Sequence, residues 1–243
     1  MKIINAQINI LFKSIKEDKK IIEDMINKLS ESYNLAKMEG KDSEMEDIPY
    51  SIPRIIGKSK HGHSQISISL NRAEISIVFD ESFYESIENC ITYIREKSKE
   101  VYDSLKSFVE ERYLFSGITV TTIIDELNEN PIDTITSKFV KIKAKKELYD
   151  VSTKFAYVKE NHFININISN ARGIEEIQDN INSSITKKVN YLSITFDVND
   201  KYGFSEKTNY QSDYNKLVEN IRLVERLCRE EIPKLIKGEE LDI

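Results

Sequence analysis

The segment Gln65–Phe79, with the sequence QISISLNRAEISIVF, contains two runs in which apolar and polar residues alternate. Alternation of this kind predicts strands with one buried face. Little more than Asn71 and Arg72 separates the two runs, which indicates a tight hairpin. The apolar positions are Ile66, Ile68, Leu70, Ile75, Ile77 and Phe79, and Val78 interrupts the second run.

The longest predicted helix follows this hairpin, from about Glu81 to Arg112. Its apolar residues recur at spacings of three and four, which places them on one side of a helix. Asp80 and Ser82 are candidate N-caps, and Glu85 completes a capping-box pattern with Ser82. The apolar stripe consists of Phe83, Ile87, Ile91, Ile94, Val101, Leu105 and Phe108.

The same kinds of pattern occur on both sides of this central region. Alternation predicts a strand at Ile4–Phe12, helical spacing predicts a helix over Lys16–Lys37, and Arg54–Lys60 is a candidate third strand. In the second half, strands are predicted at Leu114–Ile124, Val151–Lys159, His162–Ser169 and Tyr191–Val198, a short helix or turn around Asp133–Phe139, a polar excursion at Asn170–Lys188 and a final helix over Asp213–Lys237.

These elements predict an α+β protein in which antiparallel sheets are covered by two long helices. Residues 1–112 and 113–243 both read strand, helix, three strands and long helix. This order indicates two topologically similar halves packed as one unit, although α+β proteins also produce such an order by chance.

Composition and charge narrow the class of protein. The net charge of −6 disfavours attraction of nucleic acid or anionic membrane to the whole surface. Cys90 and Cys228 both fall in helical patterns, which suits reduced core thiols. The start of the sequence lacks an apolar signal-peptide run and no stretch approaches about 20 apolar residues, so we expect a cytoplasmic protein without a membrane span. The excess of isoleucine, lysine and asparagine indicates an AT-rich bacterial or phage gene.

The three histidines are the candidate catalytic residues. His61 and His63 lie two apart in a glycine-containing turn, and in an extended segment both rings project to the same side. His162 begins a strand and approaches them only if the two hairpins are neighbours. Together with Arg54, Lys58 and Lys60, these side chains suggest a phosphodiester-acting or nucleotide-binding site. The alternative is a solvated hairpin tip, which the sequence favours.

A second basic segment offers candidate binding residues. Lys141, Lys143 and Lys145 would line one face of a strand and could meet phosphates. Lysines on an edge strand also prevent edge-to-edge aggregation without any ligand, and this interpretation is favoured. Neither a glycine-rich phosphate loop nor a nucleophile motif occurs in the sequence. We therefore predict no metal site and no cofactor, and favour a protein that is not an enzyme.

The order of the elements resembles that of a sporadically distributed family of uncharacterised bacterial proteins of similar length. The matching elements are Ile4–Phe12, Gln65–Phe79, Glu81–Arg112, Gly117–Ile124 and Asp213–Lys237. No catalytic residues are established for that family, so none is implied here. Its patchy distribution implies mobile gene neighbourhoods, such as antiviral defence or phage counter-defence.

The leading functional hypothesis is a non-catalytic protein-binding or scaffold protein, with a place in such a system. Its partner would be another protein or a second copy of this chain, because Tyr84, Tyr93 and Tyr102 extend the apolar side of the long helix. The same tyrosines could instead widen the packed face. Nucleic acid is left open as a partner but is not favoured, and a nucleotide-binding or phosphodiester-acting protein is the alternative.

Overall fold

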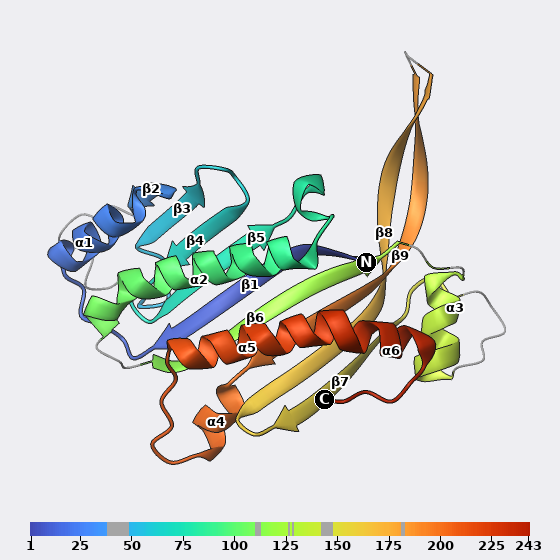
Figure 1. The fold of residues 1–243 in the computed structure, drawn as a ribbon. Helices are drawn as coiled ribbons and strands as arrows, with labels where there is room; N and C mark the ends of the chain where they lie inside the picture. The colour runs from blue at the N-terminus through green and yellow to red at the C-terminus, as the bar shows by residue number, and fades with distance from the viewer. Residues whose placement is uncertain (38–48, 110–112, 126, 128, 142–147, 181–182) are drawn as a thin grey trace.

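A single antiparallel sheet forms the centre of the protein (Figure 1). The computed structural model describes residues 1–37, 49–109, 113–125, 127, 129–141, 148–180 and 183–243, without the side chains of 175–185. Within these residues nine strands pair in the order β2-β3-β4-β5-β1-β6-β9-β8-β7. The strands are β1 (Lys2–Phe12), β2 (Tyr33–Lys37), β3 (Ile55–Ser59), β4 (Ser64–Ile68), β5 (Arg72–Val78), β6 (Tyr113–Ile124), β7 (Ser152–Lys159), β8 (His162–Asn180) and β9 (Ser183–Asn199). The predicted α+β class with antiparallel strands is confirmed.

The β1–β6 pair lies in the middle of the sheet and joins the two halves of the chain. Its register runs from Lys2 opposite Ile123 to Phe12 opposite Tyr113. Strands β5, β4 and β3 follow on one side of this pair, and β9, β8 and β7 follow on the other. This is the strand order that a duplicated unit would produce around a central pair. The duplication, and a boundary after residue 112, stay predictions.

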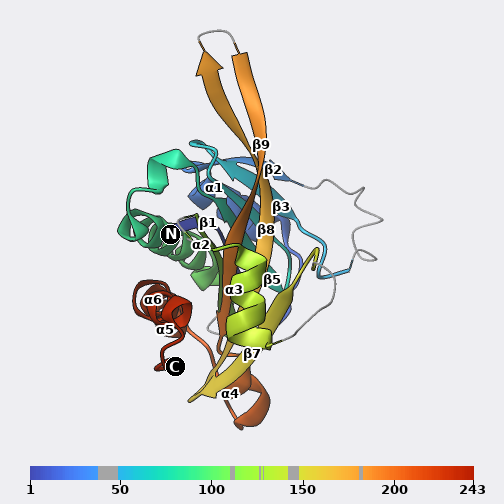
Figure 2. The same cartoon turned by 90° about the vertical axis from the view of Figure 1, so that its right-hand side faces the viewer.

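Helices cover one face of the sheet, as the view in Figure 2 shows. The long helices α2 and α5 pack against the sheet and against each other. No helix in the described part of the chain is both long and apolar enough to cross a membrane. The helical segments are α1 (Lys19–Leu29), η2 (Glu81–Phe83), α2 (Ile87–Val109), α3 (Pro131–Ile135), η3 (Thr136–Val140), α4 (Lys201–Glu206), α5 (Tyr214–Arg226), η4 (Leu227–Glu231) and α6 (Ile232–Lys237).

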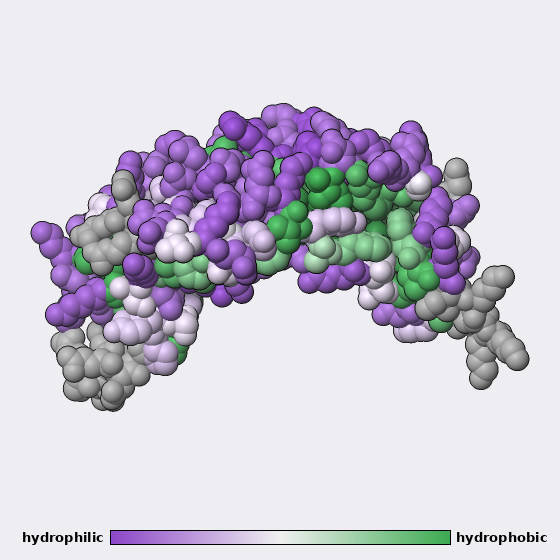
Figure 3. All heavy atoms as spheres, turned by 90° about the horizontal axis from the view of Figure 1, so that it is seen from below, coloured by the Kyte–Doolittle hydropathy of each residue, from purple (hydrophilic) through white to green (hydrophobic). Residues whose placement is uncertain are grey.

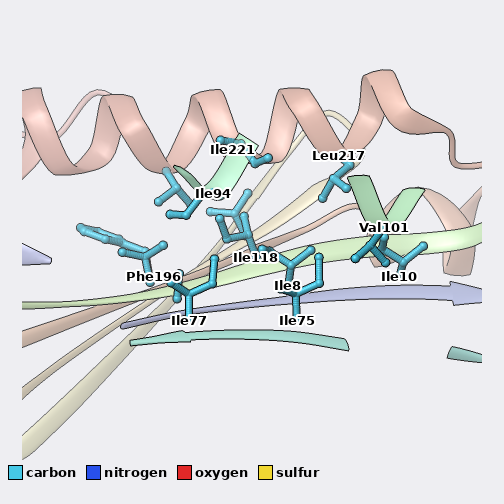
Figure 4. Close-up of a cluster of buried hydrophobic side chains, with 14 of the residues drawn as sticks. Ile8, Ile10, Ile75, Ile77, Ile94, Val101, Ile118, Phe196, Leu217 and Ile221 are labelled. Atoms are coloured by element: carbon cyan, nitrogen blue, oxygen red, sulfur yellow. The ribbon is translucent and has the colours of Figure 1, made fainter. Parts of the chain in front are cut away.

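The core lies between the sheet and the two long helices (Figure 4). Ile8 and Ile118 of the central strand pair point towards the helices. Ile94 of α2 and Ile221 of α5 point towards the sheet. All four side chains are fully buried. The alternating residues of Gln65–Phe79 behave as predicted, because Ile66, Ile68, Ile75 and Ile77 also point into this core. The hairpin that the sequence predicted there is β4–β5.

The predicted helix over Lys16–Lys37 is too long. Helix α1 ends at Leu29, and Tyr33–Lys37 forms the edge strand β2, which pairs with β3. The Ser30 hydroxyl donates to the Asn27 carbonyl at the helix end, a local bond with which serine competes with helical structure. Tyr33 is buried in β2 and also fitted the apolar spacing of the predicted helix, so its position in the sequence could not distinguish a helix from a strand.

The long helices are also divided where the sequence predicted continuity. Asp80 caps the short η2 turn by accepting from the Ser82 N–H at 3.0 Å, and α2 begins only at Ile87. Ser82 lies inside η2, where its hydroxyl donates to Asp80, so it is not the N-cap of α2 and the predicted capping box with Glu85 does not form. The helix predicted over Asp213–Lys237 contains the π-helical turn η4 just before Pro233, because proline has no N–H to continue the α-helical ladder.

The polar excursion predicted at Asn170–Lys188 is instead a long two-stranded arm. Strands β8 and β9 stay paired far beyond the sheet, with Arg172 opposite Asn190 and Glu175 opposite Lys187. Figure 1 shows this arm extending away from the rest of the molecule. At the described start of the arm Arg172 and Ile174 are exposed, and a strand without a buried face does not need the apolar alternation on which strand prediction depends.

Both cysteines are buried free thiols, as the sequence predicted. Burial raises the pKa of Cys90 from 9.0 to about 11 and that of Cys228 from 9.0 to about 12. The thiolate is the nucleophilic form, and the raised pKa keeps both cysteines in the thiol form at pH 8. Both thiols should therefore be inert in the folded protein.

We expect Ellman's reagent to label neither cysteine in the native protein at pH 8 and both in 6 M guanidinium chloride. The raised pKa values also affect stability, because the folded chain keeps the thiol protons of Cys90 and Cys228 at pH values where the unfolded chain loses them. The stability they contribute is therefore complete below pH 9 and falls as the pH rises from 9 towards 12. Urea midpoints measured from pH 7 to 10.5 test this sign, and rapid native labelling would contradict the burial.

Candidate functional site

The three histidines do not come together. His61 and His63 lie at the β3–β4 turn, whereas His162 begins β8 at the β7–β8 turn. Five strand steps separate β4 from β8 in the sheet, which is about 24 Å at about 4.8 Å per step. A single site that uses all three rings is therefore not formed by this fold.

His63 is part of an aromatic cluster that anchors the β3–β4 turn. Its ring meets Phe83 edge-on at 5.0 Å between centroids and also contacts Tyr93. Its Nδ1 lies 3.7 Å from an Asp80 carboxylate oxygen. His61 is exposed, and Gly62 has a φ of 83°, which a turn residue with a side chain rarely adopts. This turn is therefore a hairpin tip with one solvated histidine, His61, and one packed histidine, His63.

Arg54 is held by structural contacts. Its guanidinium is buried and makes a two-pronged pair with Glu17, with both N–O distances 3.0 Å. It also donates to the Ile52 carbonyl at 2.8 Å. Lys58 and Lys60 are exposed on and beside β3. Of the basic residues proposed around His61, Arg54 is thus engaged in holding the segment before β3.

The predicted strand of three lysines is not present at its described end. Lys141 follows the π-helical turn η3 and has a left-handed backbone with a φ of 54°. It therefore caps a helix and does not lie in a strand, because the preceding apolar residues Phe139 and Val140 belong to that turn and pack against the core. Lys143 and Lys145 lie outside the described residues.

Tyr84, which precedes α2, and Tyr93 and Tyr102, which lie on α2, all make contacts within the chain. The Tyr84 hydroxyl donates to the Phe79 carbonyl at 3.1 Å, and Tyr93 joins the cluster around Phe79. Tyr102 is buried and stacks on Tyr113 at 4.6 Å between centroids. These contacts fit the alternative in which the tyrosines widen the packed face, and a homodimer stays a prediction.

A pocket that the sequence did not reveal lies between the β7–β8 turn and α5. Its volume is about 290 Å³. Four basic side chains and two acidic ones surround it, together with one apolar residue. The lining residues are Lys159, Glu160, His162, Glu219, Arg222, Leu223 and Arg226.

Local structure brings these residues to one place. Glu219, Arg222, Leu223 and Arg226 follow the spacing of one helix face along α5. Lys159 pairs with His162 across the β7–β8 hairpin, whose turn residue Glu160 takes a left-handed φ of 54°. His162 is in phase with the buried residues of β8, so its ring points towards α5.

Two nitrogen atoms of this pocket are buried and lack a hydrogen-bond partner. They are His162 Nε2 and Arg226 Nη2. The nearest acid to the imidazole is Glu219, whose Oε2 lies 3.8 Å from Nε2, too far for a hydrogen bond. Glu219 is already bound by Lys216 at 2.8 Å. On the other side, Arg226 Nη1 lies 3.5 Å from the Asp242 carboxylate.

Unpaired buried polar groups are uncommon, and each costs about 1–3 kcal/mol. Two of them beside one pocket indicate that the pocket is suited to a polar ligand. Among the described residues, no group of three histidine, cysteine, aspartate or glutamate side chains is placed to hold a metal ion. The surplus of basic over acidic side chains favours an anion.

A comparison with protein-family models found no family that matches this chain, and a comparison with curated proteins found no match either. The resemblance to a sporadically distributed bacterial family stays a prediction. The assignment of function therefore depends on the geometry of the pocket.

Proposed function

We propose that this protein is a binding protein whose ligand places an anionic group in the pocket between the β7–β8 turn and α5. The observation that carries the proposal is the pair of buried, unpartnered nitrogens that belong to His162 and Arg226, two residues that line the same pocket. A carboxylate or phosphate oxygen can accept from the guanidinium and from a protonated imidazole.

The remaining lining residues suit such a ligand. Lys159 and Arg222 add positive charge at the rim, where Arg222 is exposed. Leu223 provides an apolar wall for the rest of the ligand. Glu219 and Glu160 disfavour a ligand of high negative charge, so a single carboxylate or phosphate group fits better than a polyphosphate or nucleic acid.

We favour binding over catalysis because the lining residues include no hydroxyl or thiol, and because His162 makes no hydrogen bond to Glu219 that would orient it as a general base. The earlier hypothesis of a phosphodiester-acting site required three histidines, and the fold separates them. Of that hypothesis, anion binding at His162 remains. It is compatible with the leading hypothesis of a non-catalytic protein-binding role.

The proposal predicts that Arg226→Gln weakens anion binding about tenfold or more, because a hydrogen bond to a charged group contributes about 1.5–3 kcal/mol. The probes are inorganic phosphate and N-acetylglutamate amide, titrated by calorimetry and by the rise in melting temperature. A ligand at one hundred times its Kd stabilises the folded state by about 2.7 kcal/mol, which is readily measured.

Arg229→Gln is the matched control, because it removes the same charge from the next turn of the chain. Arg229 pairs with Glu225 and Glu88 and does not line the pocket. Equal losses in the two variants would show a nonspecific charge effect. If neither probe binds to the unaltered protein, the proposal is wrong.

A further inference from the structure

The pocket lies at the end of an outermost strand of the sheet. Strand β7 is the last in the strand order and, within the described chain, pairs with β8 alone. An outermost strand presents every second N–H and C=O to its free side, where an extended segment can add by backbone hydrogen bonds. Its final residue, Lys159, is also a lining residue of the pocket.

The side chains of β7 divide into two sets. On the helix side, Phe155 and Tyr157 are half-buried and pack against the core, and Lys159 continues this row into the pocket. On the other side, Lys154 and Val158 are exposed. Figure 3 shows a hydrophobic area on the right-hand half of the face that it presents. An added strand would therefore meet apolar and basic groups in a fixed order.

Charge also favours a particular partner. The segment Ser152–Lys159 contains two lysines and no acidic residue. Arg222 and Arg226 add two cations next to the end of the strand. Antiparallel pairs are more stable per residue than parallel ones, so an added segment would run with its N-terminal end at Lys159.

We infer that the ligand is an extended segment of an acidic protein, which adds to β7 in antiparallel register and inserts a carboxylate into the pocket. Residues directly opposite each other share one face of a sheet. The acidic residue then lies opposite Lys159, and the residues two and four positions later lie opposite Tyr157 and Phe155. The recognised pattern is acid-x-apolar-x-apolar. This inference rests on the anion-binding function proposed for the same pocket.

A blocked synthetic peptide with the sequence Ser-Glu-Thr-Val-Thr-Val-Thr tests the inference by calorimetry against the intact chain. We expect it to bind at least tenfold more tightly than N-acetylglutamate amide. Replacing its glutamate by glutamine should cost about tenfold or more, as should Arg226→Gln in the protein. A peptide of the same composition with the sequence Ser-Glu-Val-Thr-Val-Thr-Thr should bind at least tenfold more weakly, because its valines face the opposite side of the strand when its glutamate lies opposite Lys159.

Backbone methylation distinguishes strand addition from binding of the side chain alone. Methyl groups on the alternate peptide nitrogens that face β7 should abolish the gain in affinity, and methyl groups on the other alternate set should leave it unchanged. If the peptide binds no better than N-acetylglutamate amide, or both methylated sets bind equally, the inference is wrong while the anion site stands. If neither probe binds, both the inference and the anion-binding function are wrong.

Discussion

Replacing Asp200 by alanine should lower the free energy of unfolding by about 3–5 kcal/mol. The carboxylate is fully buried and accepts three short hydrogen bonds. They come from the Ser116 N–H at 2.5 Å, the Ser212 hydroxyl at 2.6 Å and the Tyr210 hydroxyl at 2.7 Å. Alanine would leave three donors without an acceptor, at about 1–3 kcal/mol each, and relief of the buried charge offsets part of that loss.

The effect should be large because this one side chain joins three parts of the chain. Asp200 follows β9, Ser116 belongs to β6, and Tyr210 and Ser212 lie in the connection between α4 and α5. The Asp200 N–H also donates to the Ser116 carbonyl at 3.1 Å. Burial and the neighbouring carboxylate together raise the pKa of Tyr210, which keeps its hydroxyl protonated as a donor.

Urea unfolding followed by far-ultraviolet circular dichroism measures this loss. Ser212→Ala removes one donor and keeps the carboxylate, so it should cost only about 1 kcal/mol. Asp200→Asn keeps the shape of the side chain and should fall between the two. A cost below 1 kcal/mol for Asp200→Ala would show that water or a neighbouring group satisfies these donors.

Period-two patterns predicted the strands of the body well. The alternation in Ile4–Phe12 and Gln65–Phe79 results from a sheet with one covered face. It can therefore be recognised in the sequence without knowing the partner strand. The end of α1 and the start of α2 were predicted wrongly. Replacing one helical turn by a polar turn or a 3-10 turn costs little free energy, so packing against the rest of the protein determines where each helix ends. Tyr33 and Phe83 illustrate this. Both were predicted to lie in a helix, and both pack against the core although Tyr33 lies in β2 and Phe83 lies in η2.

The pocket could not be predicted in the same way. Arg222 and Arg226 were spaced on one face of a predicted helix, and that spacing was available as a signal. Their nearness to His162 depends on the packing of α5 over β6 and β9, which no local sequence pattern indicates. The sequence also suggested grouping His162 with His61 and His63, because residue type was the only available criterion and the strand order was unknown.

The central strand pair gives the second large effect. Ile118 is fully buried on β6, opposite Ile8 of β1 and in the cluster that α2 and α5 cover (Figure 4). Ile118→Ala should lower the free energy of unfolding by about 2–5 kcal/mol, because it removes buried methyl groups and leaves a cavity in a packed core. Ile118→Val, which removes one methyl group, should cost about 0.5–1.5 kcal/mol.

The same variant tests whether residues 1–112 and 113–243 behave as one unit. Ile118 belongs to the second half by sequence, but its neighbours Ile8 and Ile94 belong to the first. If the halves share one cooperative core, amide hydrogen exchange should accelerate equally in β4 and in the part of β8 that precedes the arm. Ile174→Ala on the exposed arm is the control and should change stability by less than about 0.5 kcal/mol. Acceleration confined to β6, β8 and β9 would mean that the halves unfold separately despite their continuous sheet.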